Sequence, residues 1–295
     1  MPIGIDHLIY SSLGLKLAAW LARAVPPRLA RTVAGWGARW MSSRRDSPTV
    51  RAVSANQQVM SGGRSSLPAA QAVEAVFRHA ARSVYDLYHY ADDPAGLERM
   101  YRFDAAFESV LARPEFDRRG LVIAGLHMAG FDLGLRWICK YRFKPLVLTM
   151  PDPRQGRRLE LQGRRAMGMN VLPFSMGALR QAVRHLQRGG MVLTGIDHPA
   201  PASDCRPCFF GRPATLPTEH IYMALRAGVP VVVVGSLLEA DGLYHVYASP
   251  PIEMERHADR SEEACSNAER VLAEAEQLIR KAPQQWLIFQ PVWPG

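Results

Sequence analysis

The stretch from Leu121 to Asp132 carries a histidine and an aspartate whose spacing suits general-base chemistry. His127 ends a short apolar run, and Asp132 follows it after the small residues Ala129 and Gly130. This order predicts a strand, a loop and the first turn of a helix. In that layout the Asp132 carboxylate can hold one ring nitrogen of His127 while the other nitrogen faces a substrate, as in a general base. The alternative is a buried histidine that a helix-start aspartate satisfies.

The composition of the chain limits the class of protein. With 295 residues there is room for one large domain or two small ones, and 48% hydrophobic residues allow a sizeable core. The formal net charge of +9 comes almost entirely from arginine, because the only lysines are Lys16, Lys140, Lys144 and Lys281. Arginine binds phosphate and carboxylate in a forked manner, so the charge is compatible with an anionic partner. No nucleic-acid-binding module appears, and we expect no nucleic-acid partner.

The cysteines indicate neither a disulfide-built secreted domain nor a metal centre. The chain contains four of them: Cys139, Cys205, Cys208 and Cys265. Cys205 and Cys208 have metal-ligand spacing, with His198 and His220 on either side. A zinc site usually needs a second close pair, and a redox pair normally lies at a helix start after a strand. We therefore predict no metal ion and no cofactor.

Residues 1–115 are predicted to form an N-terminal helical segment. Leu8–Val25 has its two basic residues on one helical face and apolar side chains on the other, and Arg28–Met41 interleaves tryptophans with arginines. Such helices suit the surface of an anionic membrane, whereas their charges disfavour a spanning helix. The alternative is two helices packed on the rest of the protein. Further helices are predicted at Ala69–Tyr90 and Phe103–Arg113.

Residues 116–295 alternate apolar runs with helical patterns and are predicted to form one integrated core. Strands are predicted at Leu121–Leu126, Pro145–Met150, Val171–Phe174, Met191–Ile196, Pro230–Leu238 and Tyr244–Ala248. Helices are predicted at Asp132–Tyr141, Arg154–Met167, Met176–Gln187, Thr218–Ala227 and Ser261–Lys281. This order predicts an α/β fold with a mostly parallel central sheet flanked by helices. Active sites of such sheets lie at the carboxyl ends of strands, and His127 and Asp197 each follow a strand.

Several sequence blocks occur in an order that resembles a known enzyme superfamily. The blocks are the His127-x4-Asp132 motif, the segment Arg164–Gly168, the strand end Thr194–His198, the Phe-Phe-Gly block Phe209–Ala214 and the closing Pro283–Trp286. Together they resemble the lysophospholipid acyltransferase superfamily, in the branch of bacterial lipid A late acyltransferases and phosphatidylinositol mannoside acyltransferases. The likeness extends from about Leu121 to Trp293, and more faintly through the N-terminal helices.

The resemblance implies an acyltransferase that uses no covalent acyl-enzyme. His127 would be the general base and Asp132 its carboxylate partner, while Arg164 would serve as a cation for the oxyanion or for a phosphate. Asp197 would position the acceptor or Arg164. The resemblance further implies substrate binding by residues of the Phe-Phe-Gly block, namely Phe210, Gly211 and Arg212.

The implied substrates are an acyl donor and a lipid acceptor. The donor would be acyl-CoA or acyl carrier protein, and the acceptor a hydroxyl of a glycolipid or lipid A-like molecule. No cofactor is implied. The acyl chain needs an apolar groove, which the helices before Gly120 would cover. We expect a peripheral protein at the cytoplasmic face of the inner membrane.

Two departures from the branch concern the acceptor. Phe289–Trp293 replaces the more usual His-Arg-Arg-aromatic ending, and Pro217–His220 lacks the common Pro-x-Gly-Pro. The closest enzymatic alternative is a glycerol phospholipid acyltransferase, which would usually show Phe-Pro-Glu-Gly where this chain has Gly195–His198. A non-catalytic lipid-binding protein with the same fold is the alternative from a different class.

Overall fold

The computed structural model describes residues 20, 22–62, 67–90, 93–112, 119–138, 144–150, 164–165, 168–200 and 205–293. Most of the predicted helices at 8–25 and 154–167 lie outside these residues. In the described ranges, no helix combines the length and apolar character needed to cross a bilayer.

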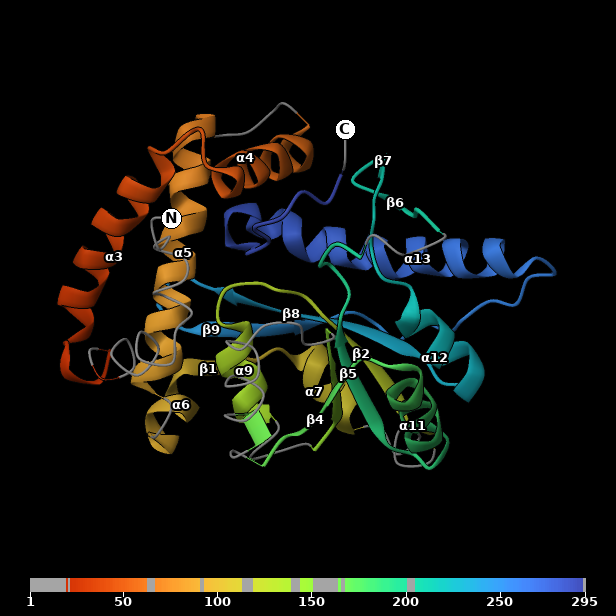
Figure 1. Ribbon diagram of the computed structural model, residues 1–295. Helices are drawn as coiled ribbons and strands as arrows, with labels where there is room; N and C mark the ends of the chain where they lie inside the picture. Colours follow the sequence, from red (N-terminus) through yellow and green to blue (C-terminus); the bar gives the residue numbers. More distant parts are fainter. Residues whose placement is uncertain are drawn as a thin grey trace.

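A seven-stranded sheet forms the centre of the molecule (Figure 1). Its strands lie in the order β1 (Tyr101–Phe103), β9 (Tyr244–Ala248), β8 (Val231–Leu238), β2 (Leu121–Gly125), β5 (Met191–Gly195), β3 (Leu146–Thr149) and β4 (Asn170–Pro173). Every neighbouring pair is parallel except β8 and β9. All five residues of the central strand β2 are buried, as expected where helices cover both faces. The predicted α/β fold with a mostly parallel sheet is confirmed.

The six predicted strands are all present, and three further ones were not predicted. The edge strand β1 has only three residues, and it lies within the segment that the sequence had assigned to helices alone. The other two, β6 (Cys208–Phe209) and β7 (Arg212–Pro213), form a separate short hairpin. Strands this short carry too few alternating positions for a period-2 pattern to be recognised.

Helices cover the two faces of the sheet unequally. The first face packs against α11 (Met176–Gln187), α12 (Glu219–Ala227) and α13 (Arg260–Lys281). Val122 and Ala124 of β2 belong to that core. The intervening residues Leu121 and Ile123 point to the opposite face and pack with Leu135 of α9 (Phe131–Trp137). This alternation follows from the period of two along a strand. Near β1, α6 (Pro94–Met100) and α7 (Ala105–Ala112) complete the second face.

The N-terminal helices pack together on one side of the molecule (Figure 1). They are α3 (Pro27–Ser42), α4 (Pro48–Ser61) and α5 (Ala69–His89). Their shared core includes Ala38, Val53 and Val76, and it also receives Leu287 and Phe289 from the end of the chain. The N-terminal segment is therefore packed against the C-terminal residues.

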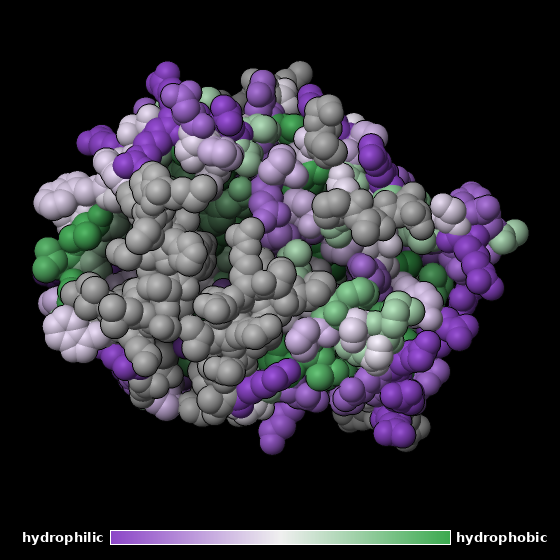
Figure 2. All heavy atoms as spheres, in the orientation of Figure 1, coloured by the Kyte–Doolittle hydropathy of each residue, from purple (hydrophilic) through white to green (hydrophobic). Residues whose placement is uncertain are grey.

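One face of α3 exposes apolar side chains. Leu29, Val33, Trp36 and Trp40 are exposed and follow one another at intervals of four, three and four residues, which places them on a single helical stripe. Figure 2 shows green side chains along the edge of the molecule where Figure 1 draws α3. Exposed arginines border the stripe: Arg28, Arg31 and Arg39.

Residues 283–292 form an extended segment, the C-terminal strap, which begins with the 3₁₀ turn η2 (Pro283–Gln285). Two buried amide side chains of α4 hold it. Asn56 Nδ2 donates to the carbonyl oxygens of Ile288 and Gln290, and Asn56 Oδ1 accepts from the Val292 N–H. Gln57 Nε2 donates to the Pro283 carbonyl oxygen at 2.8 Å. These bonds satisfy buried backbone groups of a segment that has no sheet partner of its own along most of its length.

The cysteine pairing differs from the spacing that the sequence singled out. Cys205 forms a disulfide with Cys265, which lies 60 residues away in α13, and not with Cys208. Cys208 is a free, exposed cysteine. The bond joins the loop before β6 to α13.

Candidate active site

The register of the sheet brings His127 and Asp197 together. Gly125 at the end of β2 pairs with Gly195 at the end of β5, and the two strands are parallel. His127 and Asp197 each come two residues after their glycine, so both lie at the same carboxyl edge. His127 Nδ1 is 2.6 Å from Asp197 Oδ1. An ionised carboxylate only accepts hydrogen bonds, so Nδ1 carries the proton and Nε2 has the lone pair of a base.

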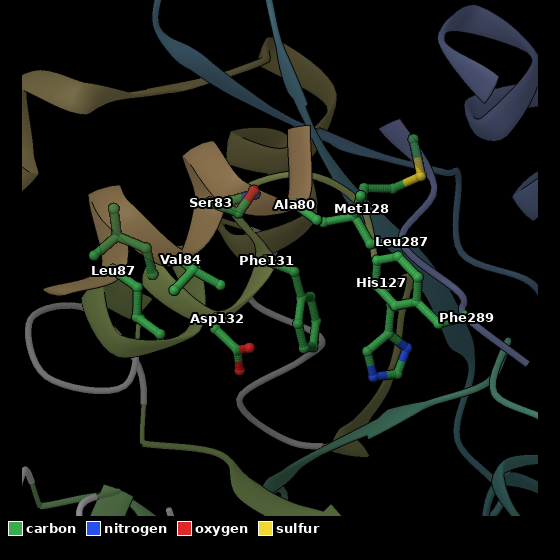
Figure 3. A pocket seen from close by; sticks show the side chains of 12 residues that line it. Ala80, Ser83, Val84, Leu87, His127, Met128, Phe131, Asp132, Leu287 and Phe289 are labelled. Carbon is green, nitrogen blue, oxygen red and sulfur yellow. The ribbon is translucent and has the colours of Figure 1, made fainter. Parts of the chain in front are cut away.

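The predicted partnership between His127 and Asp132 is wrong. Asp132 lies in the first turn of α9 and pairs with Arg164, whose Nη2 is 2.6 Å from Asp132 Oδ1. Phe131 lies between the two side chains, with its ring centroid 5.0 Å from that of His127 (Figure 3). The Asp197 carboxylate binds His127, and its role in positioning the acceptor or Arg164 stays a prediction.

Three donors converge on the Asp197 carboxylate, which is 0% exposed. Oδ1 accepts from the His127 ring, while Oδ2 accepts from the His127 backbone N–H at 2.8 Å and from Trp286 Nε1 at 2.7 Å. Burial alone would raise the pKa of Asp197, but the charge of His127 and these hydrogen bonds lower it below its ordinary value. The carboxylate therefore stays ionised although it is buried.

The same pairing changes the basicity of His127. Burial disfavours protonation of the ring, but the charge of Asp197 and its hydrogen bond to Nδ1 outweigh burial and raise the pKa of His127. The side chain keeps 34% of its surface exposed, so the ring is reachable from solvent. A histidine with a fixed tautomer, a raised pKa and an open face has the properties of a general base.

Two glycines allow the loop that carries His127 to pack closely. A Cβ atom on Gly195 would lie 2.6 Å from Cε1 of the His127 ring, so only glycine leaves room for the ring over the end of β5. Gly130 has φ of +78° and faces the ring of Tyr244, which a Cβ atom would approach to 2.5 Å. Glycine is the residue that tolerates both conditions.

Backbone groups of the loop are tied to three other parts of the chain. The Gly130 N–H donates to Ser83 Oγ of α5, and the Gly130 carbonyl oxygen accepts from the Tyr101 hydroxyl of β1 at 2.6 Å. The C-terminal strap supplies the other two contacts: the Gln285 carbonyl oxygen accepts from the Ala129 N–H, and the Leu287 N–H donates to the His127 carbonyl oxygen. The loop that carries His127 is thereby fixed on both sides.

An apolar pocket of about 190 Å³ adjoins His127 (Figure 3). One wall is a stripe of α5 with Ala80, Ser83, Val84 and Leu87. The other walls come from the His127 loop and α9, and from Leu287 and Phe289 of the C-terminal strap. The pocket thus has the His127 ring and hydrocarbon side chains among its walls.

The structure places the Phe-Phe-Gly block elsewhere. Phe210, Gly211 and Arg212 form the turn and the second strand of the β6–β7 hairpin, and none of them lines this pocket. The Phe210 ring packs against Trp293, and the Arg280 guanidinium lies 4.5 Å above it. Phe210 and Gly211 both have positive φ, of 51° and 73°.

Sequence reasoning missed the roles of Ser83 and Trp286 at this site. Trp286 was visible only as part of a C-terminal signature, and no local pattern indicated that its indole would reach Asp197, 89 residues away. Ser83 is one of several small residues on α5, and nothing in its spacing distinguishes it. Among the described residues, no group of three His, Cys, Asp or Glu side chains is arranged to hold a metal ion.

Comparison with protein-family models assigns the chain to a family. The family model described as bacterial lipid A biosynthesis acyltransferase matches residues 3–294. A search of curated proteins found no significant match.

Proposed function

Because the chain belongs to the bacterial lipid A biosynthesis acyltransferase family, we propose that it moves a fatty acyl group from a thioester to a hydroxyl of a glycolipid or lipid A-like acceptor. The donor is acyl-CoA or acyl carrier protein, and His127 is the general base. The observation that carries the proposal is the buried carboxylate of Asp197, which binds Nδ1 of a histidine that lines the pocket and so leaves Nε2 as the basic nitrogen.

The proposed reaction proceeds by direct attack. His127 Nε2 takes the proton of the acceptor hydroxyl as its oxygen attacks the thioester carbonyl, and Asp197 stabilises the imidazolium that forms. The tetrahedral intermediate collapses with loss of the thiolate, which then receives the proton. The thioester itself supplies the activated acyl group, so the reaction as proposed needs no cofactor.

Arg164 and Asp132 act together in this proposal. The guanidinium is the cation for the oxyanion or for a phosphate of either substrate, and Asp132 fixes its direction at 2.6 Å. Asp132 therefore keeps a place in the site, as a partner of Arg164. Binding of the acceptor by Phe210, Gly211 and Arg212 stays a prediction from the resemblance.

The pocket is the proposed binding place for the acyl chain. Ala80, Val84 and Leu87 recur at intervals of four and three residues along α5 and present hydrocarbon to the space beside His127. An acyl chain stretched along α5 would leave its thioester carbonyl at the histidine end.

The proposed membrane contact is the exposed stripe of α3. Tryptophan and aliphatic side chains bordered by arginines favour an interface with anionic lipid. Because acyl-CoA and acyl carrier protein are cytoplasmic donors, we place the protein peripherally at the cytoplasmic face of the inner membrane. In vesicle co-sedimentation, the double substitution Trp36→Ser and Trp40→Ser should weaken binding to phosphatidylglycerol vesicles about tenfold or more. Tyr222→Ser, at an exposed aromatic of α12, is the matched control, and equal binding by all three proteins would contradict this contact.

The activity is tested by thioester turnover. The protein is incubated with acyl-CoA, or with acyl carrier protein, and a bacterial lipid extract, and free thiol is followed. We expect lipid-dependent release that falls about 10³-fold in His127→Ala. His245→Ala removes a histidine that also pairs with an aspartate, at the protein surface, and should retain activity.

Two other functions are distinguished by the same assay. Mass spectrometry of an acylated glycerol phosphate would favour a glycerol phospholipid acyltransferase. Lipid binding without thiol release from either donor would favour the non-catalytic lipid-binding protein. Release that survives His127→Ala would mean that another group is the base.

A further inference from the structure

Trp286 connects the C-terminal strap to the catalytic pair. Its side chain is 1% exposed, and its Nε1 donates to Asp197 Oδ2 at 2.7 Å. An indole N–H only donates and an ionised carboxylate only accepts, so this hydrogen bond has one possible direction. It therefore fixes the rotation of the carboxylate as well as its position.

The other two donors to Asp197 cannot fix it in the same way. Both belong to His127, one from the ring and one from the backbone, and both move with the loop that the carboxylate is required to orient. Of the hydrogen bonds that the structure describes for this carboxylate, the one from Trp286 comes from a separate part of the chain.

Trp286 is itself held in place. Its ring lies 6.0 Å from that of Phe209 and 6.1 Å from that of Trp293, in an aromatic cluster between the β6–β7 hairpin and the end of the chain. Its backbone forms an antiparallel bridge with Met128, and the neighbouring strap residues bond the Ala129 N–H and the His127 carbonyl oxygen. The strap thus forms hydrogen bonds both with the loop that carries His127 and with the carboxylate of Asp197 that orients the ring.

We propose that Trp286 is a positioning residue of the acyl transfer, whose indole N–H sets the orientation of Asp197 and through it the tautomer and direction of the His127 ring. The proposal rests on the proposed function for its kinetic consequence. The positioning of Asp197 and His127 by the indole N–H rests on the hydrogen-bond geometry alone.

The kinetic test compares two tryptophans of one cluster. Trp286→Phe keeps an aromatic ring and removes the N–H. Trp293→Phe is the matched control, because its Nε1 donates to the Phe209 carbonyl oxygen at 2.9 Å and not to Asp197. In thioester turnover we expect kcat to fall about 10- to 100-fold in Trp286→Phe with KM little changed, and to stay within about threefold in Trp293→Phe.

The pH profile separates positioning from packing. Without the indole donor, the negatively charged His127–Asp197 pair loses stabilisation relative to its protonated form, so the apparent pKa of the pair rises. The acid limb of kcat/KM should move to higher pH by about one unit in Trp286→Phe and should not move in Trp293→Phe. Lower activity with an unmoved limb would make Trp286 a structural residue only and overturn the proposal.

A titration without substrate keeps this inference distinct from the proposed function. The His127 ring signal is assigned by its loss in His127→Gln and is followed by NMR across pH. A higher pKa in Trp286→Phe supports the positioning role even if no acyl transfer is found. Benzothienylalanine at position 286 is the second variant, because it keeps the bicyclic ring and replaces only the N–H by sulfur. An unchanged titration in that folded variant overturns the proposal.

Discussion

Two histidine–aspartate pairs among the described residues have nearly equal lengths and very different surroundings. His127 Nδ1 lies 2.6 Å from Asp197 Oδ1, and His245 Nε2 lies 2.8 Å from Asp241 Oδ2. Asp197 is fully buried and receives three hydrogen bonds, whereas the Asp241 side chain is 46% exposed. The first pair joins the ends of two parallel strands, and the second bridges residues only four apart.

The comparison teaches that a short distance does not identify a catalytic pair. The pKa of Asp241 is lowered chiefly by the Leu243 N–H, and next by its hydrogen bond from His245, in an environment open to water. An exposed pair of this kind adds little to stability, because solvent screens its charges and competes for its hydrogen bonds. Burial disfavours the ionised form of Asp197. The charge of His127 and the hydrogen bonds from His127 and Trp286 offset this cost, and they do so only while these donors stay in place.

The largest difference between the two pairs should appear when each carboxylate becomes an amide. Asp197→Asn replaces one of the two accepting oxygens by a donating NH2 group, so the tautomer of His127 is no longer fixed, and thioester turnover should fall about 10³-fold. Asp241→Asn should leave turnover unchanged within about twofold. Circular dichroism checks that both variants are folded, and equal activities in two folded variants would contradict the assignment of Asp197.

A smaller effect is expected when the buried ring is displaced without changing its chemistry. Gly195→Ala introduces a Cβ atom 2.6 Å from Cε1 of His127, so the ring must shift. A displacement near 1 Å costs about 100-fold in rate when it misplaces a catalytic group, and we expect a loss of about 10- to 100-fold in kcat. Gly177→Ala in α11 is the control, because its nearest contact would be an ordinary 3.8 Å from Ser175 Oγ. Full activity in Gly195→Ala would show that the ring position is not critical.

The pH dependence of turnover tests the raised basicity of the buried pair. Base catalysis requires unprotonated Nε2, and Asp197 raises the pKa of His127 above its ordinary value of 6.5. The rate constant kcat/KM should therefore fall on the acid side with an apparent pKa above 6.5. An acid limb of the kcat/KM profile centred below pH 6.5 would mean that burial outweighs Asp197 in setting the pKa of His127.

The smallest effect concerns stability. Because the folded-state pKa of His127 is raised, its contribution to folding is fully present below pH 6.5 and is lost as pH rises through the folded pKa. In denaturant titrations, the difference in free energy of unfolding between the wild-type protein and His127→Gln should be largest on the acid side. A difference that stays constant from about pH 5 to about pH 9 would contradict the raised pKa.

The sheet could be predicted from the sequence because its strands are continuous apolar runs. Each of the six predicted strands lies within about two residues of its observed bounds, since buried parallel strands leave a strong local signal. The short strand β1 and the β6–β7 hairpin left no such signal. Their positions depend on pairing with distant segments.

Only some residues of the candidate site could be predicted from the sequence. The strand-end rule drew attention to both His127 and Asp197, but it does not say which strands are neighbours. The crossover that places β5 directly beside β2 is a property of the whole sheet, and it decided that Asp197 and not Asp132 would meet the ring. Trp286 is set by packing of the strap against α4 and the aromatic cluster, which no local pattern encodes.

The order in which the ribosome makes the chain gives the C-terminal strap a further consequence. Asn56 and Val292 are 236 residues apart, and the strap that joins them also closes the His127 loop. A nascent chain that has already formed β2 and β5 has His127 beside Asp197 without the Trp286 indole and the Leu287 N–H that bind them. The hydrogen bonds of the strap can therefore form only after it has left the ribosome, so premature termination before Pro283 should give a protein with most of its sheet and a His127–Asp197 pair that lacks these hydrogen bonds.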